Sequence, residues 1–223
     1  MAPAPCPAAA PCVLFYGPIV FDADPVPLDP DVYEPFEKPL LPAGAVVTIA
    51  DEDAWRSMET ADFATFNLVI IGDNLDWHPH PEYLQAAFDT RDTWNAAITG
   101  RVLAQGIDAG FHTVHSEKPE AARTYLRASL SWLTQGPGTA LYVSSIAREY
   151  DYLSGLGAFV SSGDEGDLVA LDDPSHPIFA GSTAESLSDW VITYHRAATS
   201  FPGDFARVAS SASGNAIVLV RDR

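Results

Sequence analysis

The stretch LVIIGD, from Leu68 to Asp73, carries four large apolar side chains in succession before its first charge. A strand that is apolar at every position must be covered on both faces, as the strands of parallel sheets are. The Gly-Asp pair marks the end of the strand and the start of a loop. The stretch therefore predicts a central strand in an α/β domain, with helices on both sides of the sheet.

Shorter apolar runs on either side of this stretch predict four further strands. They cover residues 13–15, 46–49, 102–104 and 141–143. Helical spacing of apolar residues follows Asp51, recurs between 83 and 98 with a break near Thr90, and is clearest over 117–135. Strands that alternate with helices pair in parallel through right-handed crossovers. We therefore expect all five strands to be adjacent in one open, mostly parallel sheet.

The last third of the chain has a different pattern, with short strand-like runs separated by turns. These runs are DLVAL at 167–171, DWVITYH at 189–195, ARVASS at 206–211 and AIVLVRD at 216–222. Short strands joined by turns favour antiparallel pairing. We expect them to be antiparallel additions at the edge of the sheet.

The first twelve residues, MAPAPCPAAAPC, are rich in Pro and Ala and are expected to form an arm, with one α/β domain over 13–223. Both cysteines, Cys6 and Cys12, lie in this arm and are expected to be outside the fold. Their spacing suits neither a redox CxxC pair nor a zinc site. A local disulfide and two free thiols both stay open, and so does the compartment, cytoplasmic or part of an exported assembly, since no targeting signal is recognisable.

The net charge of −18, from 30 acidic against 12 basic residues, argues against nucleic acid as a partner because phosphates would be repelled. Apolar runs also fall short of the ~18 residues that span a bilayer, so we expect a soluble chain without membrane insertion. A protein partner or a second copy of the chain is the expected kind of partner. The proline-rich, acidic stretch 18–42 is expected to be an extended loop that is available for such contacts.

Several stretches together resemble the class I glutamine amidotransferase-like and ThuA-like domains of bacterial proteins. They are FNLVIIGD (66–73), WNAAITGRVLAQGIDAGFH (94–112), DDPSHPIFAG (172–181), LSDWVITYH (187–195) and NAIVLVRD (215–222). The resemblance covers roughly residues 13–222 and implies an open three-layer sheet of the flavodoxin or glutamine amidotransferase type.

Catalytic glutamine amidotransferases need a cysteine nucleophile on the sharp turn after a central strand. The corresponding stretch here, LAQGIDAGFH at 103–112, contains neither Cys nor Ser. The resemblance therefore implies a member that does not hydrolyse glutamine by this mechanism.

Polar residues follow the strands that end near Ile71 and Ala104, where an open α/β sheet forms its ligand crevice. These candidate crevice residues are Asp73, Asp76, His78, His80, Asp108, His112 and His115, with His195 as a further candidate from the last third of the chain. We expect these two strands to be neighbours in the sheet, so Asp73 and Asp108 should lie close together. Imidazole and carboxylate groups suit a divalent metal ion, although the spacing matches no standard metal motif. Helix caps and local hydrogen bonds are the alternative roles.

The acidic group Asp164, Glu165 and Asp167 leaves a similar choice between calcium binding and a solvated surface, and the second is favoured because no EF-hand spacing is present.

These observations predict a non-catalytic binding or assembly domain, with no catalytic residue and no cofactor. The alternative is a metal-assisted hydrolase or carbohydrate-processing enzyme of the ThuA-like type. That alternative would use the crevice His and Asp residues and a divalent metal ion, and the sequence leaves the metal unknown.

Overall fold

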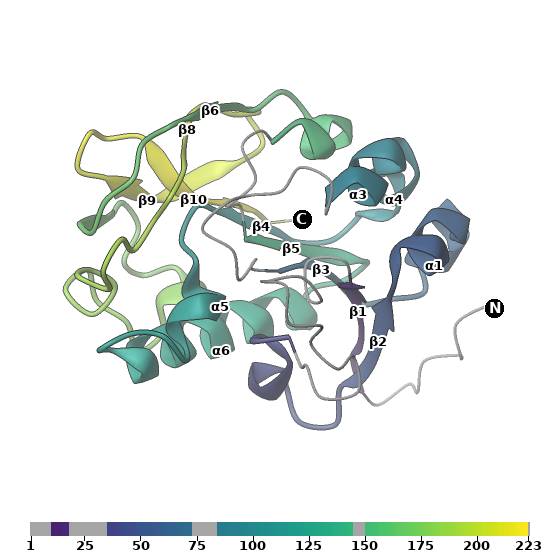
Figure 1. Cartoon of the computed structure of the whole chain (residues 1–223), viewed down its shortest axis with the longest axis horizontal. Helices are drawn as coiled ribbons and strands as arrows, with labels where there is room; N and C mark the ends of the chain where they lie inside the picture. Colours follow the sequence, from purple (N-terminus) through teal and green to yellow (C-terminus); the bar gives the residue numbers. More distant parts are fainter. Residues whose placement is uncertain (1–9, 18–34, 73–83, 145–149, 223) are drawn as a thin grey trace, which may run out of the picture.

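The computed structural model describes residues 10–17, 35–72, 84–144 and 150–222. Ten strands form one sheet, in the order β2-β1-β3-β5-β4-β10-β8-β6, with β9 joined to β10 and β7 joined to β9 (Figure 1). The strands are β1 Cys12–Tyr16, β2 Val46–Ala50, β3 Leu68–Ile71, β4 Val102–Gln105, β5 Ala140–Ser144, β6 Val160–Ser162, β7 Val169–Leu171, β8 Ala197–Ser200, β9 Ala206–Ser211 and β10 Ala216–Arg221. Within the described ranges, no helix is both long and apolar enough to cross a membrane.

The first five strands are parallel and adjacent, which confirms the predicted open α/β sheet. Their order differs from the expected one in a single respect. β5 lies between β3 and β4, pairing Val69 with Leu141 on one side and Val102 with Leu141 on the other. The expectation that β3 and β4 are neighbours is therefore wrong. The connection from β3 to β4 leaves a gap of one strand in the sheet, and β5 occupies this gap later in the chain. Apolar patterning does not encode this order.

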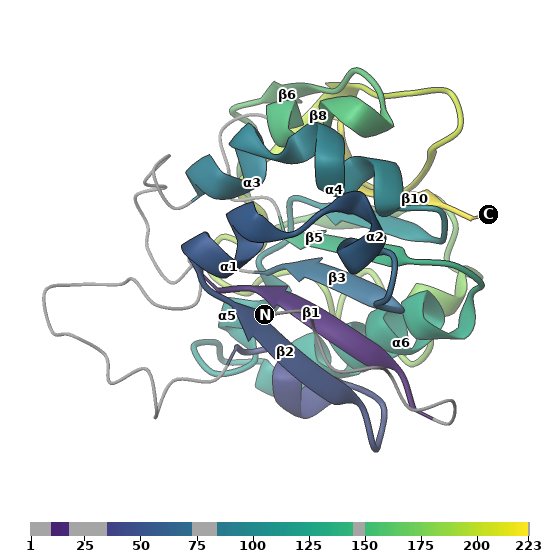
Figure 2. The same ribbon diagram turned by 90° about the vertical axis from the view of Figure 1, so that its right-hand side faces the viewer.

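Helices cover both faces of the sheet. They are α1 Glu52–Ser57, α2 Thr60–Phe63, α3 Gln85–Asp89, α4 Arg91–Ala97, α5 Ala109–His112 and α6 Pro119–Gln135, with 3-10 helices η2 Lys38–Leu40, η4 Tyr150–Leu156 and η5 Pro177–Phe179. Figure 2 shows α1, α3 and α4 on one side of the sheet and α6 on the other. Alternate residues of β3 enter the two cores: Leu68 and Ile70 face the α6 side, and Val69 and Ile71 face the side with Trp55 and Trp94.

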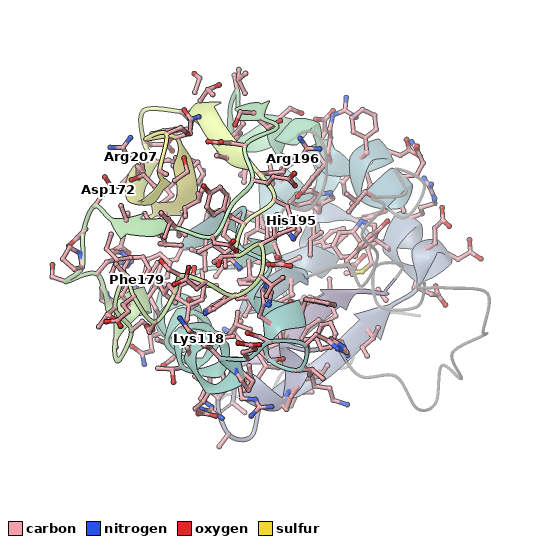
Figure 3. All side chains as sticks on the ribbon, turned by 60° about the vertical axis from the view of Figure 1, so that its left-hand side comes forward. Lys118, Asp172, Phe179, His195, Arg196 and Arg207 are labelled. Atoms are coloured by element: carbon pink, nitrogen blue, oxygen red, sulfur yellow. The ribbon has the colours of Figure 1, made fainter. Side chains whose placement is uncertain are left out.

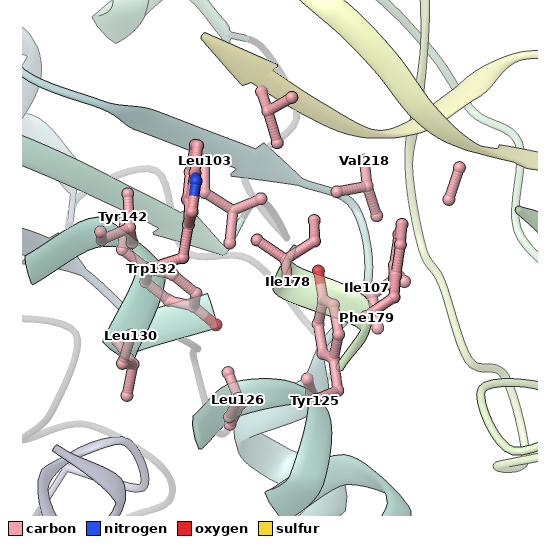
Figure 4. Packing of buried hydrophobic residues seen from close by; sticks show 14 of the residues in the cluster. Leu103, Ile107, Tyr125, Leu126, Leu130, Trp132, Tyr142, Ile178, Phe179 and Val218 are labelled. Atoms are coloured by element: carbon pink, nitrogen blue, oxygen red, sulfur yellow. The ribbon is translucent and has the colours of Figure 1, made fainter. Parts of the chain in front are cut away.

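The core on the α6 side is formed by the apolar stripe of this helix, which includes Tyr125, Leu126 and Leu130 (Figure 4). Helix α6 ends at Gln135, before Gly136, as expected. Its predicted start at 117 is two residues early, because the helix begins with Pro119, a residue that fits the first turn.

Two sequence signals at helix ends also have their predicted effect. The side chain of Asp51 accepts a hydrogen bond of 2.7 Å from the backbone N–H of Ala54 and so caps α1. The helical stretch that ends near Ile98 breaks at Thr90, whose hydroxyl donates to the carbonyl of Ala86 at 2.7 Å. The hydroxyl also accepts a 3.0 Å bond from the indole of Trp55, so the break is tied to the neighbouring helix α1.

The antiparallel additions are confirmed in the last third, where β10 pairs with β4, β8 and β9. The strand expected over 189–195 is not present. Asp189, Val191 and Ile192 have φ near +60°, a left-handed conformation that a strand does not tolerate. Tyr194 alone forms isolated bridges.

The expectation that both cysteines lie outside the fold is wrong for Cys12. Cys12 is the first residue of β1, is 2% exposed and is disulfide-bonded. Cys6 lies outside the described residues.

Candidate functional site

The candidate site lies at the carboxyl end of β4, where three segments run side by side. Tyr194 bridges Ile107 on one side and Gly166 on the other. The backbone N–H of His195 donates to the carbonyl of Gly106 at 3.0 Å, and Gly166 and Tyr194 exchange bonds of 3.0 and 3.1 Å. This backbone pairing brings the residues next to Ile107, Gly166 and Tyr194 close to one another.

Asp108 is the centre of the site. It directly precedes α5 and is 3% exposed. One carboxylate oxygen, Oδ1, lies 2.9 Å from Nε2 of His112, one helical turn further on. The other, Oδ2, lies 3.1 Å from Nε2 of His195. The buried carboxylate is thus held between two imidazoles, one from its own helix and one from the last third of the chain.

His112 is enclosed by protein. Its side chain is 2% exposed, and Nε2 also lies 3.2 Å from the carbonyl oxygen of Ile192. Its ring packs against Trp190 at 5.2 Å between centroids. The contact with Asp108 is close, yet Oδ1 of Asp108 and Nδ1 of His112 make no aligned hydrogen bond with any described residue. These contacts give His112 a structural position beneath residues 190–192.

His195 is the member of the site that reaches solvent, with a side chain 24% exposed. Figure 3 shows it beside Arg196 on the segment that crosses the front of the molecule. Its outer nitrogen, Nδ1, lies 4.0 Å from the exposed carboxylate of Glu165. Burial lowers the pKa of His195, but the hydrogen bond to Asp108 and the charges of Asp108 and Glu165 outweigh burial and raise the pKa above its ordinary value.

The segment over His112 is strained and is held by Asp167. A carboxylate oxygen of Asp167 accepts from the backbone N–H groups of Ile192 and Thr193, the latter at 3.2 Å. The backbone carbonyl of Asp167 accepts from the N–H of Asp189 at 3.0 Å. These bonds fix the segment that contains three residues with positive φ, Asp189, Val191 and Ile192. Val191 itself is 68% exposed.

A buried polar network supports the turn from below. The side-chain N–H₂ of Gln105 donates to the carbonyl of Ile107 and to the hydroxyl of Tyr142, both at 2.9 Å. The hydroxyl of Tyr125 donates to the Gln105 carbonyl oxygen at 2.5 Å, and burial raises the pKa of Tyr125. The sequence analysis missed Gln105. An amide at the end of the apolar run VLAQ was the available signal, since a buried amide needs partners.

Three of the candidate crevice residues therefore converge: Asp108, His112 and His195. His115 does not join them, because its ring stacks on Phe111 at 4.7 Å and is exposed. Asp73, Asp76, His78 and His80 lie outside the described residues.

The two histidines direct Nε2 at the same carboxylate and not at a shared open point. Within the described ranges, no group of three or more His, Cys, Asp or Glu side chains is arranged to hold a metal ion. The three acidic side chains of residues 164–167 also contact different partners and do not converge on one point. Asp164 accepts hydrogen bonds from Ser213, Asn215 and Ser211, which lower its pKa. Asp167 accepts from backbone N–H groups instead, and Glu165 faces His195.

Comparisons with known proteins return no match: no family model, no curated protein and no solved structure is similar to this chain. The relationship to glutamine amidotransferase-like and ThuA-like domains stays a prediction from the sequence motifs.

Proposed function

We propose that this chain is a non-catalytic binding or assembly domain of the glutamine amidotransferase-like type. The observation that carries the proposal is the closure of the turn after β4. In an enzyme of this architecture the turn must present a reactive side chain to the substrate.

Here the backbone of residues 194–196 covers the turn. An ideal Cβ on Gly106 would lie 1.8 Å from the carbonyl oxygen of Arg196, so even a methyl group has no room. The N–H of Gly106 donates to the carbonyl of Ile217 at 2.8 Å and is not available to a substrate oxygen. Asp108, the reactive group nearest to the turn, is buried between its two imidazoles.

Charge supports a protein as the binding partner. The net charge of −18 keeps phosphate backbones and anionic surfaces at a distance. Acidic surfaces of this kind attract basic protein segments. Another acidic protein can bind without repulsion only at the parts of the surface that carry no charge.

A second candidate function is favoured by one specific observation. Asp108 holds Nε2 of His195 and leaves Nδ1 toward solvent, which is the arrangement of a general base with its orienting carboxylate. A metal-assisted hydrolase or carbohydrate-processing enzyme that uses His195 as its general base would fit this arrangement.

A substrate panel separates the two. Glutamine and chromogenic esters and glycosides are offered to the wild-type chain with and without zinc, manganese and magnesium, beside His195→Ala and the matched variant His115→Ala. We expect no turnover that depends on His195. Turnover that is lost in His195→Ala and kept in His115→Ala would replace the binding proposal with the hydrolase.

A further inference from the structure

Strand β2 forms one edge of the sheet and has a neighbour on one side only, the parallel strand β1. The backbone N–H of Val46 donates to the carbonyl of Pro11 at 2.9 Å. Because alternate residues of a parallel strand turn both backbone groups to the same side, Val46, Thr48 and Ala50 bond to β1 while Val47 and Ile49 turn outward. In the described part of the chain, nothing forms a hydrogen bond with the outward groups of Val47 and Ile49.

Within the residues that the structure describes, this edge has none of the features that usually protect an edge strand. Its five pairs with β1 run without a register shift, from Val46 opposite Cys12 to Ala50 opposite Tyr16. The strand contains no Lys, no Pro and no inward charge. The opposite edge differs, because β6 has three residues and an irregular register between Val160 and Ser161. β7 is a further edge, because it pairs only with β9, but it has three residues. Among the edge strands of the described sheet, β2 is therefore the longest regular one.

The distribution of charge around β2 indicates which partner can bind at this edge. A second copy brings another −18 charges and can approach only where the surface is neutral. Residues 39–50, PLLPAGAVVTIA, include β2 and carry no charge, while Asp51, Glu52 and Asp53 follow directly. A basic partner would be attracted to those acids and not to the strand. An antiparallel arrangement of two copies keeps the two acidic ends apart, at opposite ends of the joint strand pair.

We propose that two copies of this chain associate through β2, antiparallel about a two-fold axis at Thr48, so that the two sheets become continuous. In this register Val47 pairs with Ile49 of the second copy, and each exchanges both outward backbone bonds. The inference rests on the proposed assembly function and names its partner and surface.

The side chains suit this register. Val47 and Ile49 already pack partly against the core on the α6 side, and the pairing would extend that layer across the axis. On the other face Thr48 would lie opposite its own copy, and Val46, 41% exposed, would lie opposite Ala50. Pairs of β-branched residues directly opposite each other stabilise antiparallel strands.

The position of Thr48 on the axis gives a direct test by sedimentation equilibrium. Thr48→Lys places two ammonium groups opposite each other and Thr48→Glu places two carboxylates, so each variant alone is expected to raise the dimer dissociation constant at least tenfold. Mixing the two variants pairs Lys with Glu and should restore association. Val160→Lys, on the opposite edge, should leave the wild-type constant unchanged.

A second measurement uses the wild-type chain alone and so does not depend on whether the charged variants fold. Amide hydrogen exchange of the wild-type chain should slow at Val47 and Ile49, and not at Thr48, as the protein concentration rises through the dissociation constant. A wild-type chain that is monomeric at every concentration, or Lys and Glu variants that dimerise as well alone as together, would overturn the β2 contact. Neither result bears on the proposed function, which rests on the turn after β4. That proposal is contradicted only by turnover that depends on His195.

Discussion

The carbonyl oxygen of Arg196 occupies the space in which a side chain on Gly106 would begin, 1.8 Å from the ideal Cβ position. Gly106→Ala must therefore displace the backbone of residues 194–196. We expect the free energy of unfolding to fall by about 3 kcal/mol, the upper range for overpacking against backbone. Chemical denaturation measures the loss. Gly203→Ala, where no heavy atom lies within 4 Å of the added Cβ, is the control and should change it by less than ~0.5 kcal/mol.

The strain at Val191 makes an unusual substitution favourable. Val191 has φ of +65° and is 68% exposed, so Val191→Gly removes a left-handed β-branched residue and little packing. We expect a gain in stability of about 1 kcal/mol, measured by thermal or chemical unfolding. The matched variant is Val160→Gly, also at an exposed valine but in β6, and it should lose about 1 kcal/mol. Equal losses in both variants would show that the backbone at Val191 is not strained.

Protonation of His195 should stabilise the fold. Its pKa is raised in the folded state by Asp108 and Glu165, so the stabilisation is complete below its ordinary pKa of 6.5 and is lost as pH rises through the folded-state value. His195→Gln should flatten this decline. NMR titration of the imidazole gives the folded-state pKa directly.

His176 provides an internal comparison with the opposite sign. Burial lowers its pKa, and Asp173 offsets this only in part. Its contribution is therefore present above pH 6.5 and is lost as pH falls. A pKa of His195 below that of His176 would contradict at least one of the two assignments.

Metal ions test the second candidate function. A ligand that binds only the folded state raises stability by about 2.7 kcal/mol at a hundredfold excess over its dissociation constant. We expect zinc, manganese and calcium to leave the unfolding temperature unchanged in the wild-type chain, because the two imidazoles of the site bind one carboxylate. A rise that disappears in both Asp108→Ala and His112→Ala would favour the hydrolase.

The five parallel strands could be predicted from the sequence because each has a short run of mostly apolar residues without a charge, a pattern typical of strands in a parallel sheet. The order of the strands could not be read. β5 pairs with both β3 and β4 through residues such as Leu141, and Leu141 would look the same at any central position.

The candidate site was predictable in part. Asp108 and His112 lie one helical turn apart after a strand, so their proximity follows from the sequence. His195 is 87 residues from Asp108, and its approach depends on the bridges of Tyr194 to Ile107 and Gly166. The apolar pattern of the segment 189–195 predicts a strand, which the structure does not form. The left-handed backbone of this segment is held by hydrogen bonds that the N–H groups of Ile192 and Thr193 donate to Asp167, a tertiary effect with no local signal.

The position of β10 has a consequence for folding of the chain. This strand, Ala216–Arg221, pairs with β4 on one side and with β8 and β9 on the other. The pair of Val218 and Gln105 joins residues that lie far apart in the sequence, so it forms only after a long loop has closed. Until β10 pairs, β4 lacks its neighbour on that side and its apolar residues are open to wrong contacts.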